Sequence, residues 1–186
     1  MESIPALQIG WLNGWVLLVV LYSIFGILVL SSPKDVIRRL YDRSGWSREQ
    51  AVLVRIGKLV TFAWLALTIL TPLKIGSPVF ILGLIILAVG IVGLVIALIN
   101  YRSTPPDEPV TKGFYRISRN PQALTLLVSF YGISIAVGSW LALFILTVSL
   151  VFHHLTVLAE EGSCLRQYGD SYRAYMRRVP RYFVFF

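Results

Sequence analysis

The sequence has little of the chemistry that metal and disulfide proteins depend on. It contains one cysteine, Cys164, so no disulfide forms within the chain. Its two histidines, His153 and His154, are adjacent, and adjacent side chains on a helix point about 100° apart. The pair therefore does not chelate one metal ion from a shared face, and we predict a function that needs no metal.

Acidic residues are also scarce. Nine Asp and Glu stand against 17 Lys and Arg, which gives a net charge of +8. Such a charge often indicates a nucleic-acid partner. Here the basic residues lie between long apolar blocks, where they set membrane topology and meet anionic headgroups. The sequence therefore predicts no nucleic-acid partner and a lipid bilayer as the surroundings of the chain.

Long apolar stretches are what the sequence does contain. Hydrophobic residues make up 56% of the 186 residues, and the mean hydropathy of +0.75 is far above that of soluble proteins. Several blocks reach the roughly 20 residues that a helix needs to cross a bilayer. We predict one all-α integral membrane domain over residues 1–186. Its five transmembrane helices are expected at about 11–30, 51–73, 79–99, 121–137 and 140–158.

Local signals refine this bundle. Ser47-Arg-Glu-Gln50 reads as a capping box before the second span. Gly83 and Gly90 permit the third span to approach a neighbouring helix closely. The stretch from Asp35 to Asp42 places apolar residues at helical spacing among basic ones. We expect it to form a short helix on the membrane surface.

The last two spans are joined almost without a loop. No charged residue lies between Gln122 and Ala159, so spans four and five are predicted to form a tight hairpin. Gly169 is expected to break the helix that continues beyond span five. An amphipathic C-terminal helix from Tyr172 to Val179 is predicted to follow on the cytoplasmic membrane surface.

The basic residues predict the orientation. With five spans, 16 of the 17 Lys and Arg fall on one side of the membrane, and Lys74 alone falls on the other. Because basic residues are enriched in cytoplasmic loops, the N-terminus is predicted outside and the C-terminus in the cytoplasm. The membrane is either the plasma membrane or an endomembrane.

A polar, basic loop leads into span four with the sequence Val110-Thr-Lys-Gly-Phe-Tyr-Arg-Ile-Ser-Arg-Asn-Pro121. Asn120 suits a helix N-cap, and proline suits the first helical position. Free backbone N–H groups at this helix end, with Arg116 and Arg119 beside them, are typical of a seat for an anionic group. These arginines are also compatible with a role in topology alone.

A second polar cluster follows one helical hairpin later, with Glu160-Glu161 and then Tyr168-Gly-Asp-Ser-Tyr172. Together the two stretches resemble the C-terminal signature of the isoprenylcysteine carboxyl methyltransferase and phospholipid methyltransferase group of membrane enzymes. The resemblance covers about residues 108–180. The chain departs from that signature at Asn120, where the family usually has His, and at Ala123, where it usually has Tyr.

The resemblance implies S-adenosylmethionine as cofactor and a lipophilic or lipidated acceptor. A prenylcysteine carboxylate, a phospholipid amine and a small thiol all suit an apolar-lined site. Either glutamate suits the ribose hydroxyls or the cofactor's ammonium group, and alternatively the pair serves only to bind nearby arginines. The cofactor-binding residues expected on these grounds are Val110, Gly113, Tyr115, Arg119, Asn120, Pro121, Glu160 and Glu161.

Methyl transfer from a sulfonium needs neither a metal nor a covalent nucleophile, because the methyl group is already activated. The protein must hold donor and acceptor in line. Candidate catalytic residues are Arg119, Asn120 and His154, and candidate acceptor-binding residues are Arg55, Lys58 and Tyr172. Because an asparagine does not titrate, Asn120 is expected to hydrogen-bond and not to act as a base.

Two other functions fit parts of the sequence. The pattern from Cys164 to Pro180 also resembles the tail of sterol reductases, which use NADPH, although those chains are longer. A non-catalytic membrane module that keeps the fold is the third interpretation. In the leading interpretation, the loop from Asn100 to Asn120 folds over the cofactor as a lid, stiffened at one end by prolines.

Overall fold

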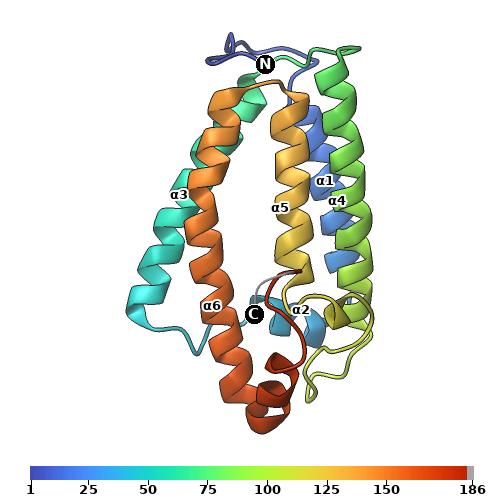
Figure 1. The fold of residues 1–186 in the computed structure, drawn as a ribbon, viewed down its shortest axis with the longest axis vertical. Helices are drawn as coiled ribbons and strands as arrows, with labels where there is room; N and C mark the ends of the chain where they lie inside the picture. Colours follow the sequence, from blue (N-terminus) through green and yellow to red (C-terminus); the bar gives the residue numbers. More distant parts are fainter. Residues whose placement is uncertain (184–186) are drawn as a thin grey trace.

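The computed structural model describes residues 1–183, and within them the chain is all-helical, as predicted. The six α-helices are α1 (Trp15–Leu30), α2 (Lys34–Tyr41), α3 (Arg48–Leu70), α4 (Pro78–Arg102), α5 (Pro121–Ala136) and α6 (Trp140–Met176). A short 3-10 helix, η1, covers Gly113–Arg116. Figure 1 shows α1, α3, α4, α5 and α6 along the long axis of the molecule, with α2 across one end.

The ends of the helices follow from local sequence. Ser47 begins α3 through the predicted capping box: its hydroxyl accepts from the Gln50 backbone N–H at 3.1 Å, and the Gln50 side chain accepts from the Ser47 N–H at 2.9 Å. Ser139 caps α6 with its hydroxyl, immediately after a turn at Gly138 with φ +67°. The predicted tight hairpin between α5 and α6 is therefore present.

Glycines bring α4 and α5 into close contact. Gly83 faces the backbone of Ala136, and Gly90 faces that of Ser129. A Cβ atom at either glycine would collide with those backbone atoms, so both positions need the absence of a side chain. The predicted close approach of the third span thus takes place against α5.

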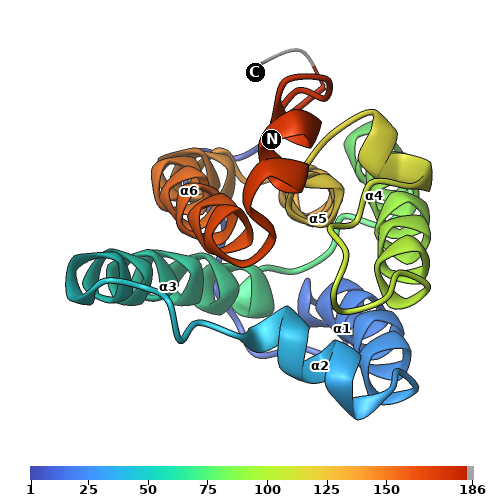
Figure 2. The same cartoon turned by 90° about the horizontal axis from the view of Figure 1, so that it is seen from below.

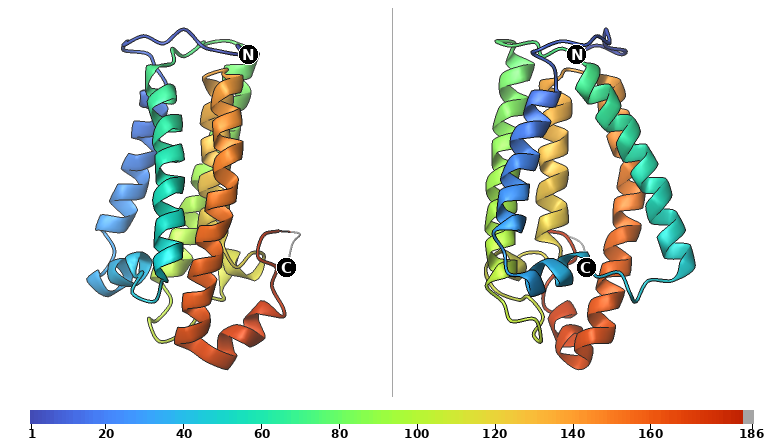
Figure 3. Two further views of the ribbon diagram at one scale, coloured as in Figure 1. Left: turned by 90° about the vertical axis from the view of Figure 1, so that its left-hand side faces the viewer. Right: turned by 180° about the vertical axis from the view of Figure 1, so that it is seen from behind.

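A buried tryptophan anchors α3 to the bundle. The Trp64 indole N–H donates to the Ser134 hydroxyl of α5 at 2.8 Å, and its ring centroid lies 4.7 Å from that of Phe130. Closer to α2, Gly57 of α3 packs on Phe152 of α6. Figure 3 shows the result: α3 follows α6 and diverges from α1 and α5 toward the end that carries α2.

Three helices, α3, α4 and α6, are long and apolar enough to cross a membrane. The apolar helices α1 and α5 have 16 residues each. That length is about 24 Å, against a hydrocarbon core of about 30 Å. With 37 residues, α6 is far longer than the hydrocarbon core, so its polar last turns extend beyond the apolar part. The predicted all-α class is confirmed, and α1 and α5 are the two predicted spans that are shorter than a full crossing.

The polar elements gather at one end of the bundle. Figure 2 views this end, where α2, the loop that contains η1 and the last turns of α6 lie around the helix ends. The helix predicted from Tyr172 onward is part of α6: the backbone breaks at Gly169 (φ +53°), as predicted, and is helical again to Met176. Tyr172 and Tyr175 are buried in one cluster with Val110, so this segment packs on the protein itself.

Candidate active site

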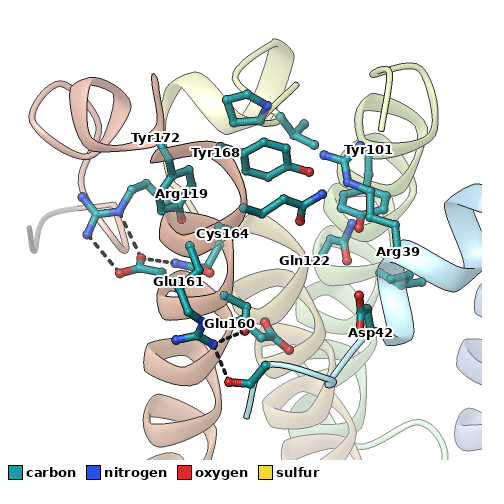
Figure 4. Close-up of a pocket in the computed structure, with 18 of the residues that line it drawn as sticks. Arg39, Asp42, Tyr101, Arg119, Gln122, Glu160, Glu161, Cys164, Tyr168 and Tyr172 are labelled. Atoms are coloured by element: carbon teal, nitrogen blue, oxygen red, sulfur yellow. Dashed lines mark hydrogen bonds and ion pairs between the residues drawn. The ribbon is translucent and has the colours of Figure 1, made fainter. Parts of the chain in front are cut away.

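A cavity of about 430 Å³ lies at the polar end of the bundle. One wall comes from α2 and the α2–α3 loop, and another from the segment around η1. The first turn of α5 and the last turns of α6 complete it (Figure 4). A volume of this size is within the range of small-molecule sites. Charged side chains from α2, from the segment around η1 and from α6 line it, together with several tyrosines.

Glu161 is the centre of a buried ion cluster beside the cavity. Its Oε1 accepts from Arg119 Nε at 3.0 Å and from Asn120 Nδ2 at 2.8 Å, and its Oε2 accepts from Arg181 Nε at 3.0 Å. The Glu161 and Arg119 side chains are 4% and 3% exposed. Burial alone would raise the pKa of the Glu161 carboxyl, but the hydrogen bonds from Arg119, Asn120 and Arg181 hold it below its usual value.

Arg119 also ties the C-terminal segment to the start of α5. Its Nη1 donates to the carbonyl oxygens of Met176 at 2.9 Å and Val179 at 2.7 Å. Its Nε and Nη2 both donate to Glu161, so every nitrogen of the guanidinium has a partner within the chain. The side-chain amide of Asn120 donates to Glu161 and makes no capping bond to α5. The sequence predicts that Arg119 and Asn120 bind the cofactor, but in this structure their donor groups bind acceptors of the protein itself.

Glu160 also lines the cavity, but it lies outside the ion cluster that Glu161 forms with Arg119 and Arg181. Successive residues on a helix point about 100° apart, so the two adjacent carboxylates enter different surroundings. Among residues 1–183, Glu160 takes part in no ion pair. Burial raises the pKa of its carboxyl, and the charge of Arg43 partly opposes that shift. Glu160 is therefore available to the hydroxyl or ammonium groups of a ligand.

Tyrosines form much of the cavity wall. Tyr115 and Tyr175 are buried, and the Tyr175 hydroxyl donates to the Tyr115 carbonyl oxygen at 2.6 Å. The Tyr172 ring centroid lies 5.7 Å from that of Tyr175. Burial raises the pKa of Tyr115 well above its usual value, so its hydroxyl stays neutral. Aromatic faces attract cations, including sulfonium and ammonium groups.

Two buried donors at the cavity have no partner within the part of the chain that the structure describes. They are Trp46 Nε1 and Gln122 Nε2. Buried N–H groups are hydrogen-bonded in nearly all native proteins, so these two need an explanation. Figure 4 shows Gln122 among the residues that surround the cavity, beside Tyr101. A ligand with acceptor atoms, such as ring nitrogens or a carboxylate, would supply the missing partners.

The structure brings most of the predicted site residues to this one cavity. The predicted residues that line it are Val110, Tyr115, Arg119, Asn120, Glu160, Glu161 and Tyr172. All of them come from the two polar clusters, which are separated by the α5–α6 hairpin in the sequence. The pairing of the two clusters in space is thus as the sequence predicts.

The other predicted residues lie outside the cavity; they are Gly113, Pro121, His154, Arg55 and Lys58. Gly113 is the first residue of η1 and has a positive φ of +57°, which is a backbone role. His154 Nδ1 lies 3.0 Å from the Tyr182 hydroxyl, so its ring is hydrogen-bonded to the C-terminal segment. Arg55 and Lys58 are exposed on α3. Because α3 diverges from α5 at this level, their side chains do not reach the cavity.

Several cavity residues were not predicted from the sequence, because the motif that indicates the site covers only about residues 108–180. Those from earlier in the chain include Arg39, Asp42, Arg43, Trp46 and Tyr101. The sequence does contain one indication of further cavity residues. Cys164 and Tyr168 follow Glu160 at intervals of four residues, which places all three on one face of the helix. Nothing in the sequence indicates that α2 contributes to the same wall.

The apolar helices indicate an integral membrane protein, and its cavity lies at the polar end of the helix bundle. The family model for phospholipid methyltransferase matches residues 75–171, just over half of the chain, and the chain belongs to that family. No curated protein and no solved structure matches the chain. The matched residues include α4, α5 and most of α6, so they cover the first polar cluster and the second as far as Ser171, but not α2.

Proposed function

We propose that this protein transfers a methyl group from S-adenosylmethionine to a lipophilic or membrane-associated acceptor, with the cavity as its active site. Family membership supports a methyltransferase acting on lipid-type substrates. The observation that carries the proposal is a pair of buried donors, Trp46 Nε1 and Gln122 Nε2, in the same cavity as the Glu160 carboxylate; among residues 1–183 the donors have no hydrogen-bond partner and Glu160 has no ion pair. When bound, the cofactor supplies an activated methyl group.

The residues present fit such a ligand. Glu160 is the group that would accept hydrogen bonds from ribose hydroxyls or bind the ammonium group. The amide of Gln122 and the indole of Trp46 would donate to acceptor atoms. The ring of Tyr172, at the same wall, suits the positive charge of the sulfonium. Arg119, through Glu161, holds these walls together without touching the ligand.

The acceptor is proposed to enter from the bilayer side. Leu40 and Ala123 give the cavity an apolar part, and Trp46 adds an aromatic face. A small residue at Ala123 leaves room beside the first turn of α5. Such a lining suits the lipophilic end of an acceptor whose reactive group reaches the polar part of the cavity.

We propose that five helices cross the membrane, with the cavity at the cytoplasmic face. Figure 1 shows α1 and α5 running alongside α4, and they are apolar throughout most of their length. Short spans are accommodated by local thinning of the bilayer. The cavity lies at the end that carries nearly all of the basic residues, whereas Lys74 lies at the other end and pairs with Glu2 at 2.6 Å. This asymmetry supports a cytoplasmic active site.

A non-catalytic role is the second candidate, because Arg119, Asn120 and Glu161 bind one another and leave fewer groups for a ligand. Isothermal titration calorimetry of the detergent-solubilised protein with S-adenosylhomocysteine and with NADPH separates the functions. Methyltransferase function predicts binding of the first and not the second. Glu160→Gln should weaken that binding, and Glu49→Gln, which changes an exposed carboxylate on α3, is the matched control. Absence of binding by the wild-type chain would refute the proposal.

A further inference from the structure

Arg39 connects α2 to the loop that follows α4. Its Nη1 donates to the carbonyl oxygens of Thr104 at 3.3 Å and Pro105 at 3.1 Å, and its Nη2 donates to that of Glu108 at 3.0 Å. One guanidinium therefore binds three backbone carbonyls of a single loop. The planar fork of arginine allows several such bonds at once, which a lysine ammonium does not match.

The loop that Arg39 binds has few other means of holding its shape. Pro105, Pro106 and Pro109 have no N–H groups, so they cannot donate backbone hydrogen bonds. From α6, the Tyr168 hydroxyl donates to the Pro106 carbonyl oxygen at 3.1 Å. The loop is thus held between side chains of α2 and α6, through its carbonyl groups.

The same arginine also contacts two rings of the cavity wall. Its Cζ lies 4.7 Å from the ring centroid of Tyr101 and 5.8 Å from that of Tyr168 (Figure 4). Cation–π contacts at these distances favour a fixed position for the guanidinium. The preceding residue of α2, Arg38, is exposed to solvent. The two neighbouring arginines therefore have the same charge and different surroundings.

We propose that Arg39 is a positioning residue: it holds the 104–108 segment in place and thereby the cavity wall that follows it, so that cofactor affinity depends on α2. The segment continues directly into Pro109 and Val110, which line the cavity. In this proposal α2 is part of the active site as well as a helix on the membrane surface. The expected effect of Arg39 on cofactor affinity rests on the proposed methyltransferase function, whereas the role of Arg39 in holding the loop does not.

The test compares Arg39→Gln with Arg38→Gln, since both variants lose one positive charge from the same helix. Calorimetry with S-adenosylhomocysteine should show at least tenfold weaker binding for Arg39→Gln and wild-type binding for Arg38→Gln. Arg39→Lys should fall between wild type and Arg39→Gln, because it keeps the charge and loses the fork. Amide hydrogen exchange at residues 103–111 of the ligand-free proteins should be faster only in the Arg39 variants.

The outcomes separate the two proposals. If wild type binds the ligand and Arg39→Gln binds it equally well, the positioning role is refuted. If wild type binds no S-adenosylhomocysteine, the proposed function is wrong, and hydrogen exchange then decides the role of Arg39 alone. Equal exchange in the Arg39→Gln and Arg38→Gln proteins overturns that role, whereas faster exchange confined to Arg39→Gln supports it. A thermal melt identifies any variant that fails to fold, and Arg39→Lys then replaces it in the comparison.

Discussion

Replacing Glu161 and Glu160 separately by glutamine should affect two different properties. Glu161→Gln keeps the shape of the side chain and removes the charge that Arg119 and Arg181 share. Removing one partner of a buried ion pair costs about 3–5 kcal/mol. Arg181 is 21% exposed, so water lowers this cost, and we expect about 3 kcal/mol. For a chain of this length, that corresponds to a Tm lower by roughly 6–12 °C.

The dependence on pH provides a second measurement of the same cluster. The pKa of Glu161 in the folded state lies below its ordinary value of 4.5. The cluster therefore stabilises the fold fully above pH 4.5 and loses this contribution as the pH falls through the lower folded-state pKa. Glu161→Gln has no such group to protonate. The difference in Tm between wild type and variant should therefore shrink as the solution is acidified below pH 4.5.

Glu160→Gln should leave Tm within about 2 °C of wild type, because Glu160 forms no ion pair among residues 1–183 and substitutions outside such networks usually change stability by no more than about 0.5 kcal/mol. Its affinity for S-adenosylhomocysteine should fall about tenfold, or ~1.4 kcal/mol. Thermal melts and calorimetry in the same detergent measure both variants. The reasoning is refuted if Glu161→Gln melts like wild type, or if Glu160→Gln loses stability and keeps its affinity.

Three further predictions follow from the fold and the cavity. Reporter fusions should place the C-terminus in the cytoplasm and the N-terminus outside; two cytoplasmic termini would exclude five spans. Hydrogen exchange across residues 102–119 should slow when S-adenosylhomocysteine binds, since ordering of a lid protects its amides, and unchanged exchange at saturation would exclude a lid. Burial raises the pKa of Cys164 to about 11, so maleimide labelling of its thiol should be slow at pH 8 and should become about tenfold faster per pH unit. Because Cys164 lines the cavity, bound ligand should protect the thiol. Fast labelling at pH 7 would contradict the burial of Cys164.

Much of the fold was predictable because its determinants are local. The capping box at Ser47, the turn at Gly138 and the break at Gly169 each depend on a few adjacent residues, and the structure contains all three. The apolar blocks likewise determine where helices form. The exact ends differ by a few residues, because the last turn of a helix depends on the packing of neighbouring elements. The first predicted span begins four residues before α1 for that reason.

The walls of the cavity were predictable only where the motif lies. Tyr115 and Tyr172 belong to two clusters whose shared spacing indicates a common site. Arg39 and Trp46 belong to a surface helix and a loop with no such spacing. Their place at the cavity depends on how α2 packs across the end of the bundle. That packing is a contact between elements far apart in sequence. The hydrophobic periodicity of a single helix does not predict such a contact.

The adjacent glutamates show most clearly where sequence reasoning stops. From the sequence, Glu160 and Glu161 are equivalent: both stand at the end of the same apolar helix, and either suits a ligand or an arginine. A rotation of about 100° between them is enough to give them opposite surroundings. Both residues line the cavity, but Glu161 pairs with Arg119 and Arg181 and is 4% exposed, whereas Glu160 takes part in no ion pair among residues 1–183. The rotation of α6 about its own axis, relative to α5, decides which carboxylate stabilises the fold and which is available to a ligand. That rotation is set by tertiary packing.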